Sequence, residues 1–142
     1  MSIFIGTVQT YQNKFDMAQA SLNQAEMLLD IHQSNASRPE LYNAMGLLYE
    51  CRGDFANADR YYRMAQDTAQ SMEYLEQVYV ARMNVIKVNM FFTPGRWYYD
   101  ELLKIANESR TYGLKNAQIH ALLFIVWFEG VYGEQRTWEN LM

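Results

Sequence analysis

The stretch Leu41-Tyr-Asn-Ala-Met-Gly-Leu-Leu-Tyr-Glu-Cys-Arg-Gly-Asp-Phe-Ala-Asn-Ala-Asp-Arg-Tyr-Tyr-Arg-Met-Ala65 decides the fold of this chain. Its large apolar and small residues recur every three or four positions on both sides of Gly53, and residues with that spacing share one face of an α-helix. They are Tyr42, Met45 and Tyr49 before the glycine, and Phe55, Ala58, Tyr62 and Ala65 after it; Ala69 continues the spacing beyond the stretch. The pattern predicts two helices joined by a tight turn, which is a helical hairpin.

Three signals indicate the ends of these two helices. Ser37-Arg38-Pro39-Glu40 has the form of a capping box with proline in the first turn, so a helix is expected to begin there. Gly53 permits the positive φ of a tight turn. Asp54 is a good N-cap for the second helix, because its carboxylate can accept hydrogen bonds from the first free backbone N–H groups.

The same residue types recur along the chain at intervals close to 40. The spacing is 40 from Gly6 to Gly46 and from Ala18 to Ala58. Two longer series have steps of 40 and 41: Ala25, Ala65 and Ala106, and Leu22, Tyr62 and Leu103. The turn glycines Gly53, Gly95 and Gly133 have steps of 42 and 38. A period near 40 with two helices per unit is typical of an α-solenoid.

The sequence therefore predicts an all-α protein, a solenoid of helical hairpins with about seven to eight helices. The expected helices are 2–12, 15–33, 39–52, 55–71, 73–92, 96–112, 116–131 and 135–142. They group into repeats of about 1–34, 37–71, 73–112 and 116–142, the last one incomplete. The turn at Thr93-Pro94-Gly95 is expected to be one residue longer than the others. Since no linker-like stretch divides the chain, we expect a single domain over 1–142.

Composition excludes several other classes of protein. The chain has 142 residues, of which 50% are hydrophobic and 15% aromatic, and it contains only seven Gly and two Pro, too few for an all-β fold with its many turns. The net charge of -4 argues against nucleic acid as a partner. The longest apolar run, 121–128, is far shorter than a membrane span, and the N-terminus lacks the pattern of a signal peptide. We expect a cytoplasmic protein without a membrane partner.

The residue types that carry chemistry are isolated in this sequence. His32 and His120 have no second metal-binding residue at ligand spacing, the carboxylates are spread singly, and no glycine-rich phosphate loop exists. Cys51, beside Arg52, has two interpretations: a thiol with a lowered pKa, or a half-buried structural cysteine. We predict no enzyme, no metal and no cofactor.

The stretch around Gly53 resembles the tetratricopeptide repeat. The matching positions are Tyr42, Gly46, Tyr49, Gly53, Asp54, Phe55, Ala58, Tyr62 and Ala65. The resemblance implies a right-handed superhelix that binds a protein or peptide on its concave face. The family's standard period is shorter, about 34 residues. The longer period here resembles the repeats of bacterial regulators, so we expect a sensor or regulatory segment of a larger signalling or transcription-regulatory protein.

In such a solenoid the first helix of each hairpin lines the concave face. The repeat register assigns that lining to Thr7, Tyr11, Asn43, Leu47, Glu50, Val80, Met83, Lys87, Met90, His120, Leu123 and Trp127. Its apolar character suits a hydrophobic helix or peptide. An alternative function is a peptide- or small-ligand-sensing pocket lined by Met83, Met90 and Trp127. The alternative for each residue is that it packs against a neighbouring helix and binds nothing.

The run Ala121–Phe128 is apolar on every face of its predicted helix, and such a helix is normally buried on all sides. The predicted partner helix, 135–142, is only about two turns long. Two interpretations follow: the chain is a fragment of a longer array, or this end docks on another molecule. We favour the fragment, and we expect the isolated chain, as a consequence, to form a homodimer through these apolar C-terminal helices.

Overall fold

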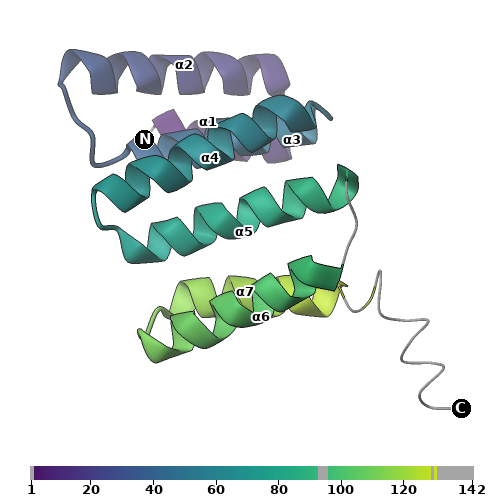
Figure 1. The fold of residues 1–142 in the computed structure, drawn as a ribbon. Coiled ribbons are helices and arrows are strands. Elements are labelled where there is room, and N and C mark those ends of the chain that lie inside the picture. Colours follow the sequence, from purple (N-terminus) through teal and green to yellow (C-terminus); the bar gives the residue numbers. More distant parts are fainter. Residues whose placement is uncertain (1, 93–95, 129, 131–142) are drawn as a thin grey trace, which may run out of the picture. The chain divides into compact units, whose positions relative to one another are not determined.

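The computed structural model describes residues 2–92, 96–128 and 130, which contain seven α-helices and no strand (Figure 1). The prediction of an all-α fold is confirmed. The helices are α1 (Ser2–Tyr11), α2 (Phe15–Ile31), α3 (Arg38–Cys51), α4 (Phe55–Ser71), α5 (Leu75–Phe92), α6 (Arg96–Thr111) and α7 (Lys115–Phe128). The predicted helix 135–142, the turn at 93–95 and Gly133 lie outside the described residues. Within the described part of the chain, no helix is long and apolar enough to cross a membrane.

The chain divides into two compact units, Met1–Asn89 and Met90–Met142. The first contains α1 to α4 and nearly all of α5. In the second, α6 packs against α7. The two units are described separately below.

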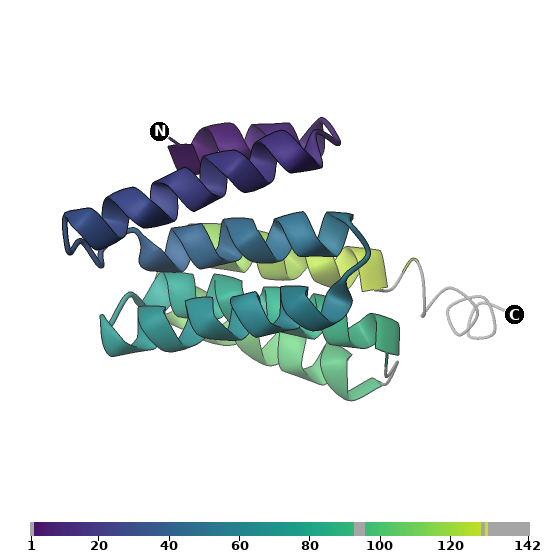
Figure 2. The same cartoon turned by 90° about the horizontal axis from the view of Figure 1, so that it is seen from above.

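In the first unit, the first hairpin packs against the second. Helix α1 pairs with α2 and α3 pairs with α4, while α3 also contacts both helices of the first hairpin. Figures 1 and 2 show α3, α4 and α5 side by side with alternating direction. The main core is formed by Ala18, Leu22, Ala25, Leu41, Ala44, Met45 and Leu48. A second cluster joins α4 to α5 through Ala58, Tyr62 and Val88.

The backbone turns repeat with the same period as the sequence. Among the described residues, positive φ occurs at Asn13 and Gly53 inside the hairpins α1–α2 and α3–α4, and at Gln33, Glu73 and Gly113 after α2, α4 and α6. Each turn has the two hydrogen bonds of a Schellman motif. For example, Lys14 N–H donates to the Gln9 carbonyl and Asp54 N–H to the Tyr49 carbonyl, both at 2.9 Å. The sequence period is therefore a true structural period, although only two of these five positions are glycine.

The buried positions of the second helices follow the same period and correct one prediction. The sequence pattern puts Leu103 in the place of Leu22 and Tyr62, but Leu103 is 38% exposed, whereas Leu102 is 1% exposed. The step from Tyr62 is therefore 40 and not 41. The residues of α6 that are equivalent to the buried face of α4 are all buried: Tyr98, Leu102, Ile105 and Ser109.

The two predicted helix caps have different outcomes. Asp54 caps α4 as expected, because its carboxylate accepts a hydrogen bond from the backbone N–H of Asn57 at 3.2 Å. Pro39 lies in the first turn of α3, as predicted, but Ser37 makes no side-chain capping bond, so the predicted capping box is wrong. Arg38 instead ties this corner together, since it donates to Asp30 at 2.6 Å and to Asn35 at 2.9 Å.

Glycine is required where the helices of the first two hairpins touch. A Cβ atom added at Gly46 would lie 2.5 Å from the Tyr62 ring, and one added at Gly6 would lie 2.7 Å from Leu22. The two glycines, like the two side chains that they contact, are one period apart. The ring of Tyr62 cannot move aside easily, because it is 1% exposed and its hydroxyl is hydrogen-bonded to Glu50.

We predict that Gly46→Ala destabilises the protein by about 1–3 kcal/mol through overpacking, although alanine in an open helix position stabilises by about 1 kcal/mol relative to glycine. Urea denaturation followed by circular dichroism measures the effect. In a Tyr62→Ala background, where the ring is absent, Gly46→Ala should cost much less. An increase in stability from Gly46→Ala alone would contradict the contact.

Candidate functional site

The residues predicted to bind a partner fall into both units. Eight of them, on α1, α3 and α5, lie in the first unit. The other four belong to the second unit: Met90, His120, Leu123 and Trp127. The predicted residues of the first unit are Thr7, Tyr11, Asn43, Leu47, Glu50, Val80, Met83 and Lys87.

Helices α3 and α5 bring two pairs of polar side chains together. The Nδ2 of Asn84 donates to the Oδ1 of Asn43 at 3.3 Å, and the Nζ of Lys87 lies 3.1 Å from the Oε1 of Glu50. Leu47 lies between Asn43 and Glu50 on α3 and is half-buried. The prediction from the sequence included three of these four polar residues. It missed Asn84, because the register placed Met83 at that position.

Glu50 is the centre of a half-buried network. Its carboxylate accepts a hydrogen bond from the hydroxyl of Tyr62 at 2.9 Å, and its side chain is only 18% exposed. Lys87, 22% exposed, pairs with Glu50 and also lies 5.9 Å from the centre of the Tyr62 ring. Burial raises the pKa of Tyr62 far above its usual range, and the negative charge of Glu50 adds to the effect. The network holds Tyr62 protonated while Lys87 balances the charge of Glu50.

The two predicted residues on α1 differ in what they offer a partner. The hydroxyl of Thr7 donates to the carbonyl of Ile3 in the same helix at 2.9 Å, so it is already used. Tyr11 is 70% exposed, and it contributes to the raised pKa of Tyr62. Tyr11 is therefore the more accessible of the two side chains.

Two methionines predicted to line a groove are core residues. Met83 is 0% exposed and Met90 is 2% exposed, so neither presents a surface to a partner. The alternative interpretation, that these residues pack against neighbouring helices, therefore holds for Met83 and Met90. The reason is that α5 has buried residues on several of its faces, which leaves little of the helix exposed. In the second unit, His120 and Leu123 are exposed, while the side chain of Trp127 lies outside the described residues.

Cys51 is neither the thiol of lowered pKa nor the half-buried structural cysteine that the sequence suggested. Its side chain is exposed, not half-buried, at the C-terminal end of α3. Partial desolvation and the negative charge of Glu50 raise the pKa of its thiol, while Lys87 lowers it to a smaller extent. Cys51 is therefore not an activated nucleophile. Over the residues that the structure describes, no three His, Cys, Asp or Glu side chains are grouped as metal ligands would be.

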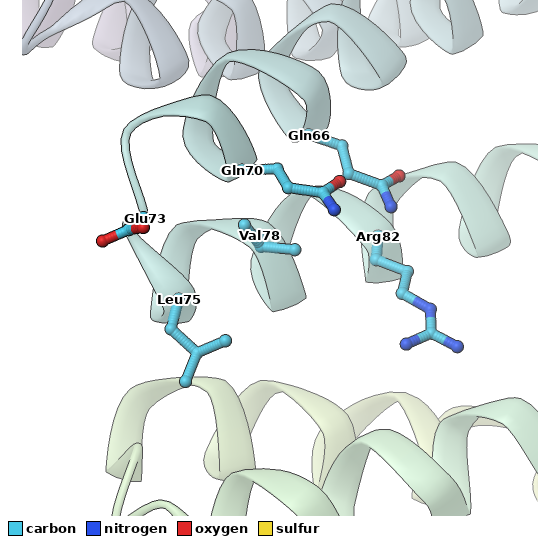
Figure 3. Close-up of a pocket in the computed structure, with 6 residues that line it drawn as sticks. All are labelled: Gln66, Gln70, Glu73, Leu75, Val78 and Arg82. Atoms are coloured by element: carbon cyan, nitrogen blue, oxygen red, sulfur yellow. The ribbon is translucent and has the colours of Figure 1, made fainter.

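A pocket that the sequence did not indicate lies between the second half of α4 and the first half of α5 (Figure 3). Its volume is about 480 Å³, within the range of small-molecule sites. The lining residues are Gln66, Gln70, Glu73, Leu75, Val78 and Arg82. Sequence analysis missed it because glutamine, leucine and valine on a helix are not a chemical motif, and only the turn at Glu73 brings them together.

We find no match between this chain and any family model, curated protein or solved structure compared with it. The geometry of the Glu50 network and of the pocket between α4 and α5 is therefore what bears on function.

The network around Glu50 makes a prediction about pH. We expect Tyr62→Phe to destabilise the protein by about 1–3 kcal/mol at neutral pH, because it removes a hydrogen bond to a charged acceptor. The raised pKa of Tyr62 stabilises the fold below about pH 10, where an unfolded tyrosine is still protonated, and this contribution declines as the pH rises. The wild type should therefore lose about 1.4 kcal/mol per pH unit above pH 10 relative to Tyr62→Phe.

Urea denaturation between pH 7 and pH 11 measures this difference. Tyr112→Phe is the matched control, because it removes the hydroxyl of an exposed tyrosine just after α6. We expect the control to follow the wild type at each pH. A constant gap between the wild type and Tyr62→Phe over the whole range would show that the network does not hold the proton.

Proposed function

We propose that this protein is a non-catalytic interaction module, and that the first unit binds an extended peptide segment of a protein partner across α1, α3 and α5. The observation that carries the proposal is the row of half-buried polar side chains on α3 and α5, in which Asn43 pairs with Asn84 and Glu50 pairs with Lys87. In each pair one side chain comes from α3 and the other from α5, so a bound segment would contact both helices.

The two asparagines are suited to the backbone of a peptide. Each side-chain amide has two N–H donors and an oxygen acceptor with two lone pairs, more than the one hydrogen bond at 3.3 Å uses. A peptide in extended conformation presents N–H and C=O groups that match such an amide. Leu47 and Val80, both half-buried, provide apolar contact beside the amides.

The sequence pattern supports the same function independently of these contacts. The tetratricopeptide-like residues of the second hairpin favour an α-solenoid that binds proteins, and the long period favours a sensor or regulatory segment of a larger signalling or transcription-regulatory protein in the cytoplasm. The alternative, a pocket for a small ligand or peptide, is no longer proposed at Met83 and Met90, which are buried.

We predict that a library of random peptides displayed on phage yields binders of the whole chain, and that the double variant Asn43→Ala/Asn84→Ala binds the selected peptides at least about tenfold more weakly, a loss of about 1.4 kcal/mol. Isothermal titration with each synthetic peptide measures the affinity. The matched control is Asn23→Ala, since Asn23 is an exposed asparagine within α2.

Two results would contradict this proposal. One is the absence of any enriched peptide. The other is that Asn23→Ala weakens binding as much as the double variant, because the selected peptides then bind elsewhere. Circular dichroism of each variant shows whether the fold is intact.

A second copy of the chain is the partner that α7 favours. Ile119, Leu122, Leu123 and Val126 are exposed and share one face of this helix at the spacing of three and four residues. The helix contains a single charged residue, Lys115 in its first turn, so two copies can pair through this face without opposing like charges in the middle.

We therefore predict that Leu123→Glu reduces self-association, because Leu123 is 61% exposed at the middle of this face. Multi-angle light scattering over a range of concentrations measures the mass. Met27→Glu is the control, since Met27 is an exposed apolar residue on α2. A wild type that stays monomeric at every concentration would exclude the dimer.

A further inference from the structure

Helix α1 has an exposed apolar surface, the α1 face, which consists of Phe4, Ile5 and Val8. Gly6 and Thr10, on the opposite side of the helix, are buried. No residue of α1 carries a charge. Because large apolar side chains that adjoin one another on a protein surface commonly mark an interaction site, the α1 face calls for an occupant.

The repeat allows the α1 face to be compared with its equivalent on α3. Since the first two hairpins have the same glycine contact between their helices, positions on α1 are equivalent to positions on α3 that lie 40 residues later. Ile5 is 44% exposed, whereas its equivalent, Met45, is 2% exposed. Val8 is 37% exposed, whereas its equivalent, Leu48, is 0% exposed. The same two positions are therefore surface in the first hairpin and core in the second.

On α3 these two positions are covered by the second helix of the preceding hairpin. Met45 and Leu48 belong to one buried cluster with Ala18, Leu22 and Ala25 of α2. The covering face of α2 thus has a large apolar residue between two alanines, at spacings of four and three residues. Small residues on such a face let two helices approach closely.

The junction between α4 and α5 repeats this arrangement. Val85 and Val88, the equivalent residues on α5, pack with Ala58 and Tyr62 of α4. Ala65, three residues after Tyr62, completes the same pattern of alanine, large apolar residue and alanine. The chain therefore shows twice which kind of helix covers the two positions that α1 exposes.

We propose that the α1 face binds an amphipathic helix of a protein partner, and that the contact face of this helix has the pattern found on α2 and α4. Ile5 and Val8 pack against this helix as their equivalents do within the chain, and Phe4 adds further apolar surface to the contact. Removal of these side chains from water drives the association. The contact face of the partner helix is uncharged, because a charge there would lose its water without gaining a partner.

The α1 face is separate from the polar pairs that carry the proposed peptide site. It contains none of the residues of those pairs, which are Asn43, Glu50, Asn84 and Lys87. Asn43→Ala/Asn84→Ala should therefore bind the partner helix as the wild type does, and each of the two proposals can fail without the other.

The probe for the α1 face is a synthetic peptide with the sequence of α2, Phe15–Ile31, which carries the required pattern. In a titration of the whole chain followed by ¹H–¹⁵N NMR, we expect the backbone N–H signals of Ile5 and Val8 to shift as this peptide is added. A peptide that differs only by Leu22→Glu should bind at least about tenfold more weakly, because it places an unpaired charge in the apolar contact.

Val8→Glu tests the same contact from the side of the chain, and should also weaken binding at least about tenfold. Met64→Glu is the matched control and should bind as the wild type does, since Met64, on α4, is 36% exposed, close to the 37% of Val8. If Val8→Glu loses its helical circular dichroism, Ile5→Glu takes its place.

Four results would overturn the proposal. The first three are no shift at the highest soluble peptide concentration, equal binding of the two peptides, and an equal loss of affinity in Val8→Glu and Met64→Glu. The fourth comes from dilution of the wild-type chain alone: concentration-dependent shifts confined to α1 would show that a second copy of the chain, and not a partner helix, covers this face.

Discussion

The contact between Gly46 and the ring of Tyr62 is the constraint on which the second hairpin depends. It allows α3 and α4 to approach so closely that a single added methyl group would collide with the ring. It also fixes where the hydroxyl of Tyr62 lies, and therefore where Glu50 and, through it, Lys87 are held. The close packing of two helices and the polar network on the neighbouring face thus follow from one small residue. The first hairpin uses the same device at Gly6 and Leu22.

Repetition with a constant period makes the differences between equivalent places informative. A repeated backbone brings equivalent positions into similar surroundings, so a change of side chain at one of them changes the chemistry while the scaffold is retained. An ion pair joins Asp30 to Arg38, whereas Gln70 and Val78, one period later, line a pocket. Leu47 and Lys87 are likewise one period apart, and only the second of them pairs with a carboxylate.

The sequence was sufficient for the helical class, the hairpin turn at Gly53 and the cap at Asp54, because each depends on contacts between residues close in the chain. It was less reliable where a choice between neighbours had to be made: Leu103 carried the expected residue type, but the burial belongs to Leu102. It also could not distinguish a methionine in a groove from one in the core, since both suit an apolar helix, and Met83 proved to be buried. The pocket could not be predicted because its lining residues form no chemical motif and come together only through the turn at Glu73.

The regular left-handed turns have a consequence for how the chain folds. Because each turn sends the chain back beside the helix that it has just left, helices that are neighbours in the chain pack together: α1 with α2, α3 with α4 and α6 with α7. A topology of this kind has a low contact order, which is associated with fast folding.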